Sequence, residues 1–317
     1  MICPLKKLSL KRKSKRKNLN TLDVDKDAPL KGKILIQMFE KPSLRTRLSF
    51  YLAIRQLGGG TITLRSNELH LGKGGESLAD TAKILSTYGD GFMLRTDSDK
   101  KINEVVKYMK IPFINGLSPS SHPTQILSDI FTVEEIKKKP ISKLNICWIG
   151  DSNNVLNSLI AASVKFSFKL NIGCPKNYKP KKIILDWGRK NKKSVHIYND
   201  PKKAVKNADV IFSDKVISLN DKVNVKKKKS FFKNFKIDNK LIKFAKKNAL
   251  LNFGNSGTLA RLLIGILSST PNIEIKILFL KLFNLNFSIC SSVYTECISI
   301  FHDIVVLRFP FNILGAL

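Results

Sequence analysis

Residues 39–47 read F-E-K-P-S-L-R-T-R, and this stretch decides how the first half of the chain can fold. It follows an apolar run of strand length and precedes a longer segment with a helical pattern. Pro42 is expected to end the strand, and Ser43 can cap the helix that follows. Backbone N–H groups at the helix start would then point to the same place as the Ser43 and Thr46 hydroxyls and the Arg45 guanidinium. The stretch predicts a phosphate site, although a serine that caps a basic helix is also common without a ligand.

Strand and helix patterns alternate outward from this stretch. The expected strands cover residues 33–39, 61–64, 92–95, 112–115, 144–149, 169–172, 195–198 and 210–213, and the expected helices of the first half cover residues 44–57, 78–88, 102–109 and 123–138. Strands that alternate with helices imply parallel sheets with helices on their faces, and ligands of such folds lie at the carboxyl ends of the strands. The sequence therefore predicts the α/β class.

The length of 317 residues exceeds what one hydrophobic core normally serves, so two domains are expected, each a parallel sheet flanked by helices. Three consecutive lysines followed by Pro140 mark the expected junction. We expect a basic N-terminal segment over residues 1–28, domains over residues 29–138 and 139–250, and an apolar tail over residues 251–317. The pattern does not fix the fold of this tail.

The formal net charge is +32, from 56 basic and 24 acidic residues, which permits a function in nucleic-acid binding. However, 46 of the basic residues are Lys and only 10 are Arg, and Lys spread over exposed faces is an ordinary solvated surface. Residues 251–317 hold four basic and three acidic residues, so nearly all of the excess lies before residue 251. We therefore expect no nucleic-acid partner.

The cysteines and the apolar segments indicate a compartment. The five cysteines show no C-x-x-C spacing, which argues against a zinc site or a disulfide framework and fits a reducing cytoplasm. The first 20 residues hold eight basic residues and no apolar stretch of secretory type. Uncharged runs in the tail are shorter than the roughly 18 residues that a membrane-spanning helix needs. We expect a cytoplasmic chain with no metal site and no membrane anchor.

Three further stretches include the carboxyl ends of expected strands. They read N-G-L-S-P-S-S-H-P-T-Q-I-L-S-D at residues 115–129, W-I-G-D-S-N-N-V at residues 148–155 and A-D-V-I-F-S-D-K-V-I-S-L at residues 208–219. Taken alone, a histidine before a helix is more often a packing residue than a catalyst, and the second stretch could be a generic nucleotide turn, although it lacks G-x-G-x-x-G. Together and in this order with residues 39–47, the stretches resemble the signatures of the aspartate and ornithine carbamoyltransferases. Within this family, the asparagine pair at residues 153 and 154 and the aspartate at residue 214 resemble the signatures of the ornithine branch.

The resemblance covers roughly residues 29–250 and implies a fold, an activity and a set of site residues. It implies the two-domain aspartate/ornithine carbamoyltransferase fold, with a carbamoyl-phosphate domain followed by an ornithine domain, and a homotrimer with active sites at subunit interfaces. It implies carbamoyl transfer from carbamoyl phosphate to the δ-amine of L-ornithine, without a cofactor or metal. The implied catalytic residues are Arg45, His122 and Gln125; the implied carbamoyl-phosphate contacts are Ser43, Leu44, Arg45, Thr46, His70, Arg95, His122 and Gln125; the implied ornithine contacts are Asn154, Asp214, Ser218 and Leu219.

The sequence also departs from the family pattern. Leu44 replaces the first threonine of S-T-R-T, which removes a hydroxyl and keeps a backbone donor. After residue 250 the family continues with F-M-H-C-L-P, whereas this chain reads L-N-F-G-N-S at residues 251–256. The missing motif coincides with the loss of charge, and our hypothesis is that the codons after about residue 250 are read in a shifted frame. Two alternatives to an active enzyme stay open: a non-catalytic relative that binds carbamoyl phosphate only, and a basic nucleic-acid-binding protein.

Overall fold

The computed structural model describes residues 23–65, 77–191, 194–214, 225–246 and 249–252. These residues form two compact units, with the division between Phe131 and Thr132. Unit 1 is the described part up to Phe131, and unit 2 is the described part from Thr132. No helix within these ranges is long and apolar enough to cross a membrane.

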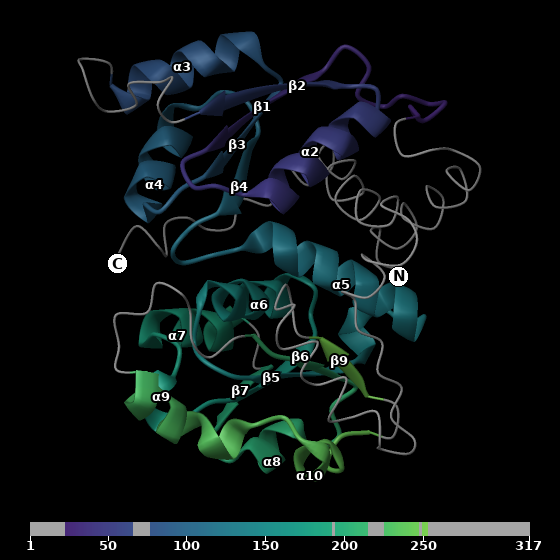
Figure 1. Ribbon diagram of the computed structural model, residues 1–317, viewed down its shortest axis with the longest axis vertical. Helices are drawn as coiled ribbons and strands as arrows, with labels where there is room; N and C mark the ends of the chain where they lie inside the picture. The colour runs from purple at the N-terminus through teal and green to yellow at the C-terminus, as the bar shows by residue number, and fades with distance from the viewer. Residues whose placement is uncertain (1–22, 66–76, 192–193, 215–224, 247–248, 253–317) are drawn as a thin grey trace. The chain divides into compact units, whose positions relative to one another are not determined.

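Unit 1 alternates strands and helices along the whole of its described length (Figure 1). Its elements are β1 (Ile34–Phe39), α2 (Leu44–Gln56), β2 (Gly60–Arg65), α3 (Leu78–Tyr88), β3 (Gly91–Arg95), α4 (Asp99–Tyr108), β4 (Phe113–Leu117) and the first part of α5 (Pro123–Lys137). Two helix starts are fixed by serine caps: the Ser77 side chain accepts a hydrogen bond from Asp80 N, and the Ser98 side chain accepts one from Lys101 N.

The sheet of unit 1 has the order β2-β1-β3-β4, and all of its pairs are parallel. Strand alternation sends Leu35 and Met93 to one face, where they pack with Phe50 and its neighbours on α2. Ile36 and Phe92 point to the other face, where they pack with apolar residues of α3 and α4. The two faces are therefore covered by different helices, as Figure 1 shows, and the carboxyl ends of β1, β3 and β4 lie next to one another.

Unit 2 repeats this arrangement with a five-stranded sheet of order β7-β6-β5-β8-β9, again with parallel pairs throughout. Its elements are the rest of α5, η1 (Ile141–Lys143), β5 (Asn145–Ile149), α6 (Asn154–Lys165), β6 (Lys169–Gly173), η2 (Lys176–Tyr178), α7 (Lys182–Asn191), β7 (Val195–Tyr198), α8 (Pro201–Val205), β8 (Val210–Phe212), α9 (Val225–Phe232), η3 (Lys233–Phe235), α10 (Asn239–Ile242) and β9 (Leu250–Asn252). Figure 1 shows α6 and α7 on one face and α8 to α10 on the other.

The predicted α/β class, with two parallel sheets flanked by helices, is confirmed. Every strand and helix range expected from the pattern has a counterpart, with ends that differ by up to three residues. Strand β9 was not expected. It is three residues long, and its pairing with β8 rather than any local pattern defines it as a strand.

Candidate functional site

The start of α2 leaves hydrogen-bond donors at the carboxyl end of β1. Ser43 occupies the N-cap position with an extended backbone (φ −155°), but its side chain makes no capping hydrogen bond, so the expected capping role of its hydroxyl is wrong. The first N–H groups of a helix have no acceptor within the helix, and the Ser43 hydroxyl supplies none here. The first turn also holds no acidic residue. This helix end can therefore receive an anion.

Sheet register brings a second cation to this place. Phe39 at the end of β1 pairs with Arg95 at the end of β3, so the arginine side chain leaves the sheet beside the start of α2. Arg95 Nη1 donates a hydrogen bond of 3.2 Å to Thr46 Oγ1, and Thr46 is buried. Arg45, on the same turn of α2, is exposed. The structure thus brings together Arg95 and Thr46, two of the phosphate contacts that the resemblance implies.

His122 lies between β4 and α5 and is 6% exposed. Its Nδ1 lies 3.3 Å from Thr124 Oγ1. Burial, and after it the nearby charge of Arg95, lower the pKa of His122 from 6.5 to about 3. The imidazole is therefore uncharged at neutral pH, and it can form hydrogen bonds without adding a full charge to the site. Gln125, in the first turn of α5, is also buried.

A closed turn fixes the backbone just before His122. Ser118 N donates to Ser121 O at 2.9 Å. Asn115, in the middle of β4, donates through its Nδ2 to both serines, at 3.3 Å to Ser118 Oγ and 2.8 Å to Ser121 Oγ. Asn115 is 7% exposed. It belongs to the family-like stretch but was not predicted as a site residue, and its contacts make it a support for the histidine.

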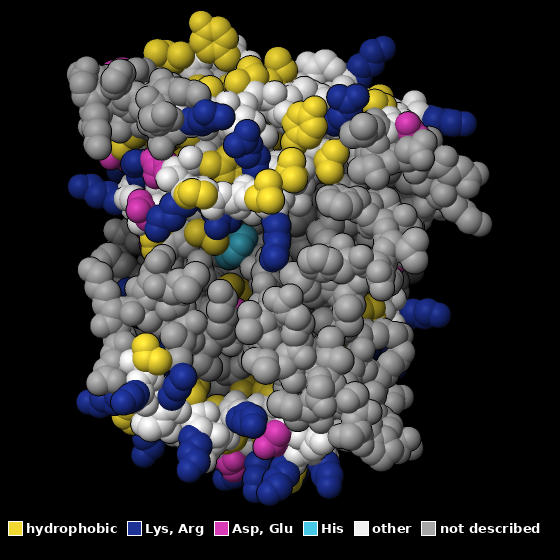
Figure 2. Space-filling view, in the orientation of Figure 1, with side chains coloured by type: hydrophobic (Ala, Val, Ile, Leu, Met, Phe, Trp, Pro, Cys, Tyr) yellow, Lys and Arg dark blue, Asp and Glu magenta, His cyan; other side chains and the backbone are white. Residues whose placement is uncertain are grey.

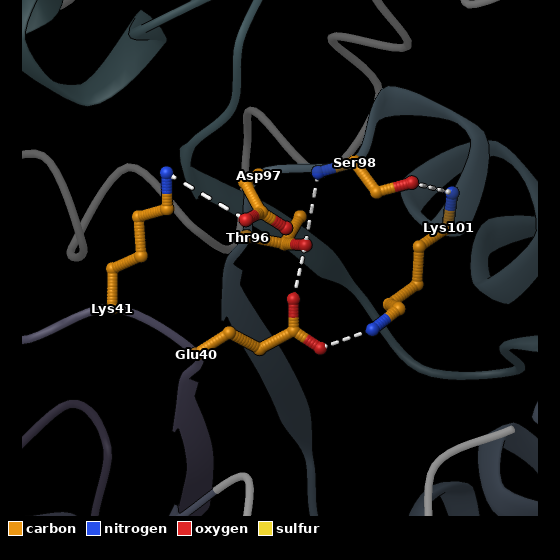
Figure 3. A network of polar contacts seen from close by, with 6 residues as sticks. All are labelled: Glu40, Lys41, Thr96, Asp97, Ser98 and Lys101. Carbon is orange, nitrogen blue, oxygen red and sulfur yellow. Dashed lines mark hydrogen bonds and ion pairs between the residues drawn. The ribbon is translucent and has the colours of Figure 1, made fainter. Parts of the chain in front are cut away.

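A polar network ties the ends of β1 and β3 together (Figure 3). Glu40 follows β1, and its carboxylate accepts hydrogen bonds from Thr96 Oγ1 and Lys101 Nζ. Glu40 N donates to Arg95 O at 3.0 Å, and Lys41 Nζ lies 3.6 Å from Asp97 Oδ2. The network joins the segment before Ser43 to the segment after Arg95, and sequence reasoning gave no sign of it.

Unit 2 has a polar cluster of its own at the carboxyl ends of β5 and β8. Asn153 caps α6, because its Oδ1 accepts from Leu156 N at 3.0 Å, and its Nδ2 donates to Asp214 Oδ2 at 3.0 Å. Ser213 Oγ donates to Ile149 O at 2.8 Å, which fixes the end of β8 against β5. Asn153 therefore orients the Asp214 carboxylate. Asn154, the residue predicted from sequence, is the first residue of α6.

The turn after β5 is held from both sides. Gly150 has φ +152°, which favours glycine, and Trp148 Nε1 donates to Asp151 O at 3.2 Å. The Asp151 carboxylate lies 2.6 Å from Lys228 Nζ of α9, and the lysine side chain is only 5% exposed. This ion pair attaches α9 to the turn that carries Asn153.

Chemically, the edge of the unit 1 sheet offers helix N–H groups, hydroxyls, guanidinium groups and a neutral imidazole, which suit a phosphate joined to a polar group. The edge of the unit 2 sheet offers an oriented carboxylate, which suits an ammonium group.

Residues 5–135 match the aspartate/ornithine carbamoyltransferase family in its carbamoyl-phosphate-binding domain, and residues 142–251 match the same family in its aspartate- or ornithine-binding domain. The chain belongs to the aspartate/ornithine carbamoyltransferase family.

Curated relatives carry the name of one branch of this family. The ornithine carbamoyltransferase of Mesorhizobium japonicum is 39% identical over 226 residues, which are 71% of this chain and 74% of that protein. The ornithine carbamoyltransferase of Brucella ovis is 42% identical over 207 residues. That match spans 65% of this chain and 65% of the Brucella protein, so the chain covers just under two thirds of that relative's length.

Solved carbamoyltransferase structures share the fold. An ornithine carbamoyltransferase from Pyrococcus furiosus superposes with a TM-score of 0.75 at 29% identity, covering 93% of this chain and 91% of that one. The anabolic ornithine carbamoyltransferase of Campylobacter jejuni gives a TM-score of 0.72 at 30% identity, covering 94% of each chain. The predicted aspartate/ornithine carbamoyltransferase fold is confirmed.

The carbamoyltransferase roles implied for single residues stay predictions. Ser43, Leu44, Arg45, Thr46, Arg95, His122 and Gln125 belong to unit 1, and Asn154 and Asp214 belong to unit 2. His70, Ser218 and Leu219 lie outside the described residues, and so does the part of the departing stretch that follows residue 252. Leu44 is 75% exposed, so its replacement of a threonine leaves an apolar side chain in solvent.

Proposed function

We propose that this chain transfers the carbamoyl group of carbamoyl phosphate to the δ-amine of L-ornithine, giving L-citrulline and phosphate, as a step of arginine biosynthesis in the cytoplasm. The observation that carries the proposal is the meeting of the start of α2, Arg95 and a neutral His122 at one sheet edge of unit 1. The family membership and the names of the relatives support the same reaction.

In this mechanism the phosphate is bound by Ser43, Arg45, Thr46 and Arg95 and by the N–H groups of the first turn of α2. Arg45, His122 and Gln125 hydrogen-bond the carbamoyl group. The neutral δ-amine attacks the carbonyl carbon, a C–N bond forms, and the C–O bond to phosphate breaks. The amine loses a proton and phosphate leaves with the electron pair. Catalysis comes from placing both substrates and from donors that stabilise the negative charge developing on the carbonyl oxygen.

Ornithine is assigned to unit 2. Asp214 would bind the α-ammonium group, and its orientation by Asn153 supports this role. Asn154, Ser218 and Leu219 are proposed as further contacts to the amino acid, and His70 as a contact to carbamoyl phosphate. No cofactor or metal takes part in the proposed reaction.

We further propose a homotrimer with active sites at subunit interfaces. Leu44, Leu48 and Tyr51 lie on one face of α2 and are 75%, 43% and 41% exposed. Figure 2 shows hydrophobic side chains gathered along the path that α2 follows in Figure 1. Contact with a second copy would remove this face from water. Light scattering should give three times the chain mass, and Leu48→Glu should lower it; a wild-type monomer would contradict the assembly.

Citrulline formation from ornithine and carbamoyl phosphate tests the proposed reaction. The wild-type chain should form citrulline, and Arg45→Gln or His122→Asn should reduce kcat/KM at least a hundredfold. Lys83→Met, a change of a distant exposed lysine, should leave the rate unchanged. A wild-type chain that binds phosphate without forming citrulline would contradict the proposed reaction and would indicate the non-catalytic relative instead.

A further inference from the structure

The phosphate site of unit 1 has a carboxylate beside it. Glu40 stands three residues before Ser43, and its N–H group bonds to the carbonyl of Arg95. A free carboxylate in this place would lower the positive potential that attracts a phosphate. Its side chain is 11% exposed, so water screens its charge poorly. The carboxylate therefore needs a partner close by.

Lys101 is that partner, and its own position is unusual. It lies in the first turn of α4, three residues after the capping Ser98, where the helix dipole disfavours a cation. Its side chain is 25% exposed and reaches back across the sheet edge to the Glu40 carboxylate, as Figure 3 shows. The ion pair with Glu40 offsets the unfavourable interaction of the lysine with the helix dipole.

The other carboxylate oxygen of Glu40 has a mechanical role. It accepts from Thr96 Oγ1, and Thr96 is fully buried and bonds through its N–H group to Leu117 O at 3.1 Å. The Thr96 hydroxyl also accepts from Ser98 N at 3.2 Å. Through Thr96, Glu40 holds the residue that follows Arg95 in register with β4.

We propose that Glu40 and Lys101 form a charge-compensated clamp that positions the two phosphate-binding segments, which are the start of α2 and Arg95. Glu40 ties the segment before Ser43 to the segment after Arg95, and Lys101 cancels the charge that this tie introduces. The inference rests on the proposed function, since it assigns the clamp to the phosphate of carbamoyl phosphate. Both residues are positioning residues and neither contacts the substrate.

The test is the Kd for inorganic phosphate, measured by calorimetry on the full chain and on three variants. Lys101→Met leaves the Glu40 charge uncompensated and should raise Kd about tenfold. Glu40→Gln should raise it less than threefold, because a carboxamide oxygen can still accept from Thr96. The double variant Glu40→Gln/Lys101→Met should return to within threefold of wild type.

Lys83→Met is the matched control. Lys83 also pairs with an acidic residue in unit 1, Asp80 at 3.4 Å, but both side chains are more than half exposed. It removes the same net charge and should leave Kd unchanged. In the citrulline assay, Lys101→Met should raise KM for carbamoyl phosphate and leave kcat within twofold.

Three results would overturn the clamp while leaving the proposed function intact: a Lys101→Met variant with the Kd of wild type, an equal loss in Lys83→Met, or a double variant as weak as Lys101→Met. The last would indicate damage to packing rather than an uncompensated charge. A wild-type chain that binds no phosphate would contradict the proposed function, and the clamp with it.

Discussion

Lowering the pH from 7.5 to 5.0 should destabilise unit 1 through His122. In the folded state burial and Arg95 hold the pKa of this histidine at about 3, whereas its ordinary value is 6.5. The unfolded state therefore binds the proton first, so the stability is fully present above pH 6.5 and is lost as the pH falls from 6.5 toward 3. At pH 5.0, protonation of this histidine in the unfolded state should lower the free energy of unfolding by about 2 kcal/mol.

The test compares how much unfolding free energy wild type and His122→Asn each lose between pH 7.5 and 5.0. The difference isolates His122, because the other groups that titrate in this range are present in both proteins. Hydrogen exchange of peptides from β1 and β3, measured against urea at pH 7.5 and 5.0, reports on unit 1 directly. Wild type should lose about 2 kcal/mol more than His122→Asn. His196→Asn is the matched control, since His196 is in unit 2 and only partly buried; its removal should leave the pH dependence of the unit 1 peptides unchanged.

Histidine NMR gives the decisive result. In a chain labelled at histidine Cε1, the resonance that is absent from His122→Asn should show no titration above pH 4.5. A midpoint near 6.5 for this resonance would refute the reasoning, because the imidazole would then be solvated or paired with an anion. A neutral His122 also predicts that the citrulline rate shows no fall between pH 7.5 and 5.5 that depends on this residue.

Other changes test separate parts of the structure. Ser43→Ala should weaken phosphate binding at least tenfold in calorimetry and leave the urea midpoint unchanged, because its hydroxyl does not cap α2; an equal loss of stability would show a cap after all. Lys228→Met removes the lysine that pairs with the Asp151 carboxylate and should destabilise unit 2 by about 3 kcal/mol, measured by tryptophan fluorescence in urea. Gly58→Ala should cost about 2 kcal/mol more than Gly32→Ala by urea unfolding of unit 1: both have positive φ, but only at Gly58 would the new Cβ meet another atom, Ala28 Cβ at 2.8 Å.

The fold could be predicted from the sequence where local signals mark the ends of elements. Helix α3 has the predicted bounds because Ser77 caps its start and Gly89 follows its end. Strand β9 could not be predicted, because a three-residue strand has no periodicity and depends on pairing with β8, whose sequence lies far away in the chain.

For the candidate site, the sequence indicated residue types but not which of these residues contact one another. Asn153 and Asn154 have the same chemistry, and which of them reaches Asp214 depends on where α6 begins, a boundary that sequence fixes only within a residue or two. The contact between Glu40 and Lys101 could not be predicted from the sequence either. These two residues are 61 positions apart and meet because β1 and β3 are neighbours in the sheet.

The parallel order of the unit 1 sheet has a consequence for folding. Ser43, Arg95 and His122 belong to the carboxyl ends of three neighbouring strands. The proposed phosphate site therefore cannot form until two parallel pairings, β1 with β3 and β3 with β4, are in place. Such non-local pairing is slow to form compared with a local helix contact. Carbamoyl phosphate would therefore bind only a chain whose sheet is already complete. At a concentration of a hundred times its Kd, it would stabilise the native state by about 2.7 kcal/mol. Besides being a reactant, the substrate would act as a ligand that favours the finished fold.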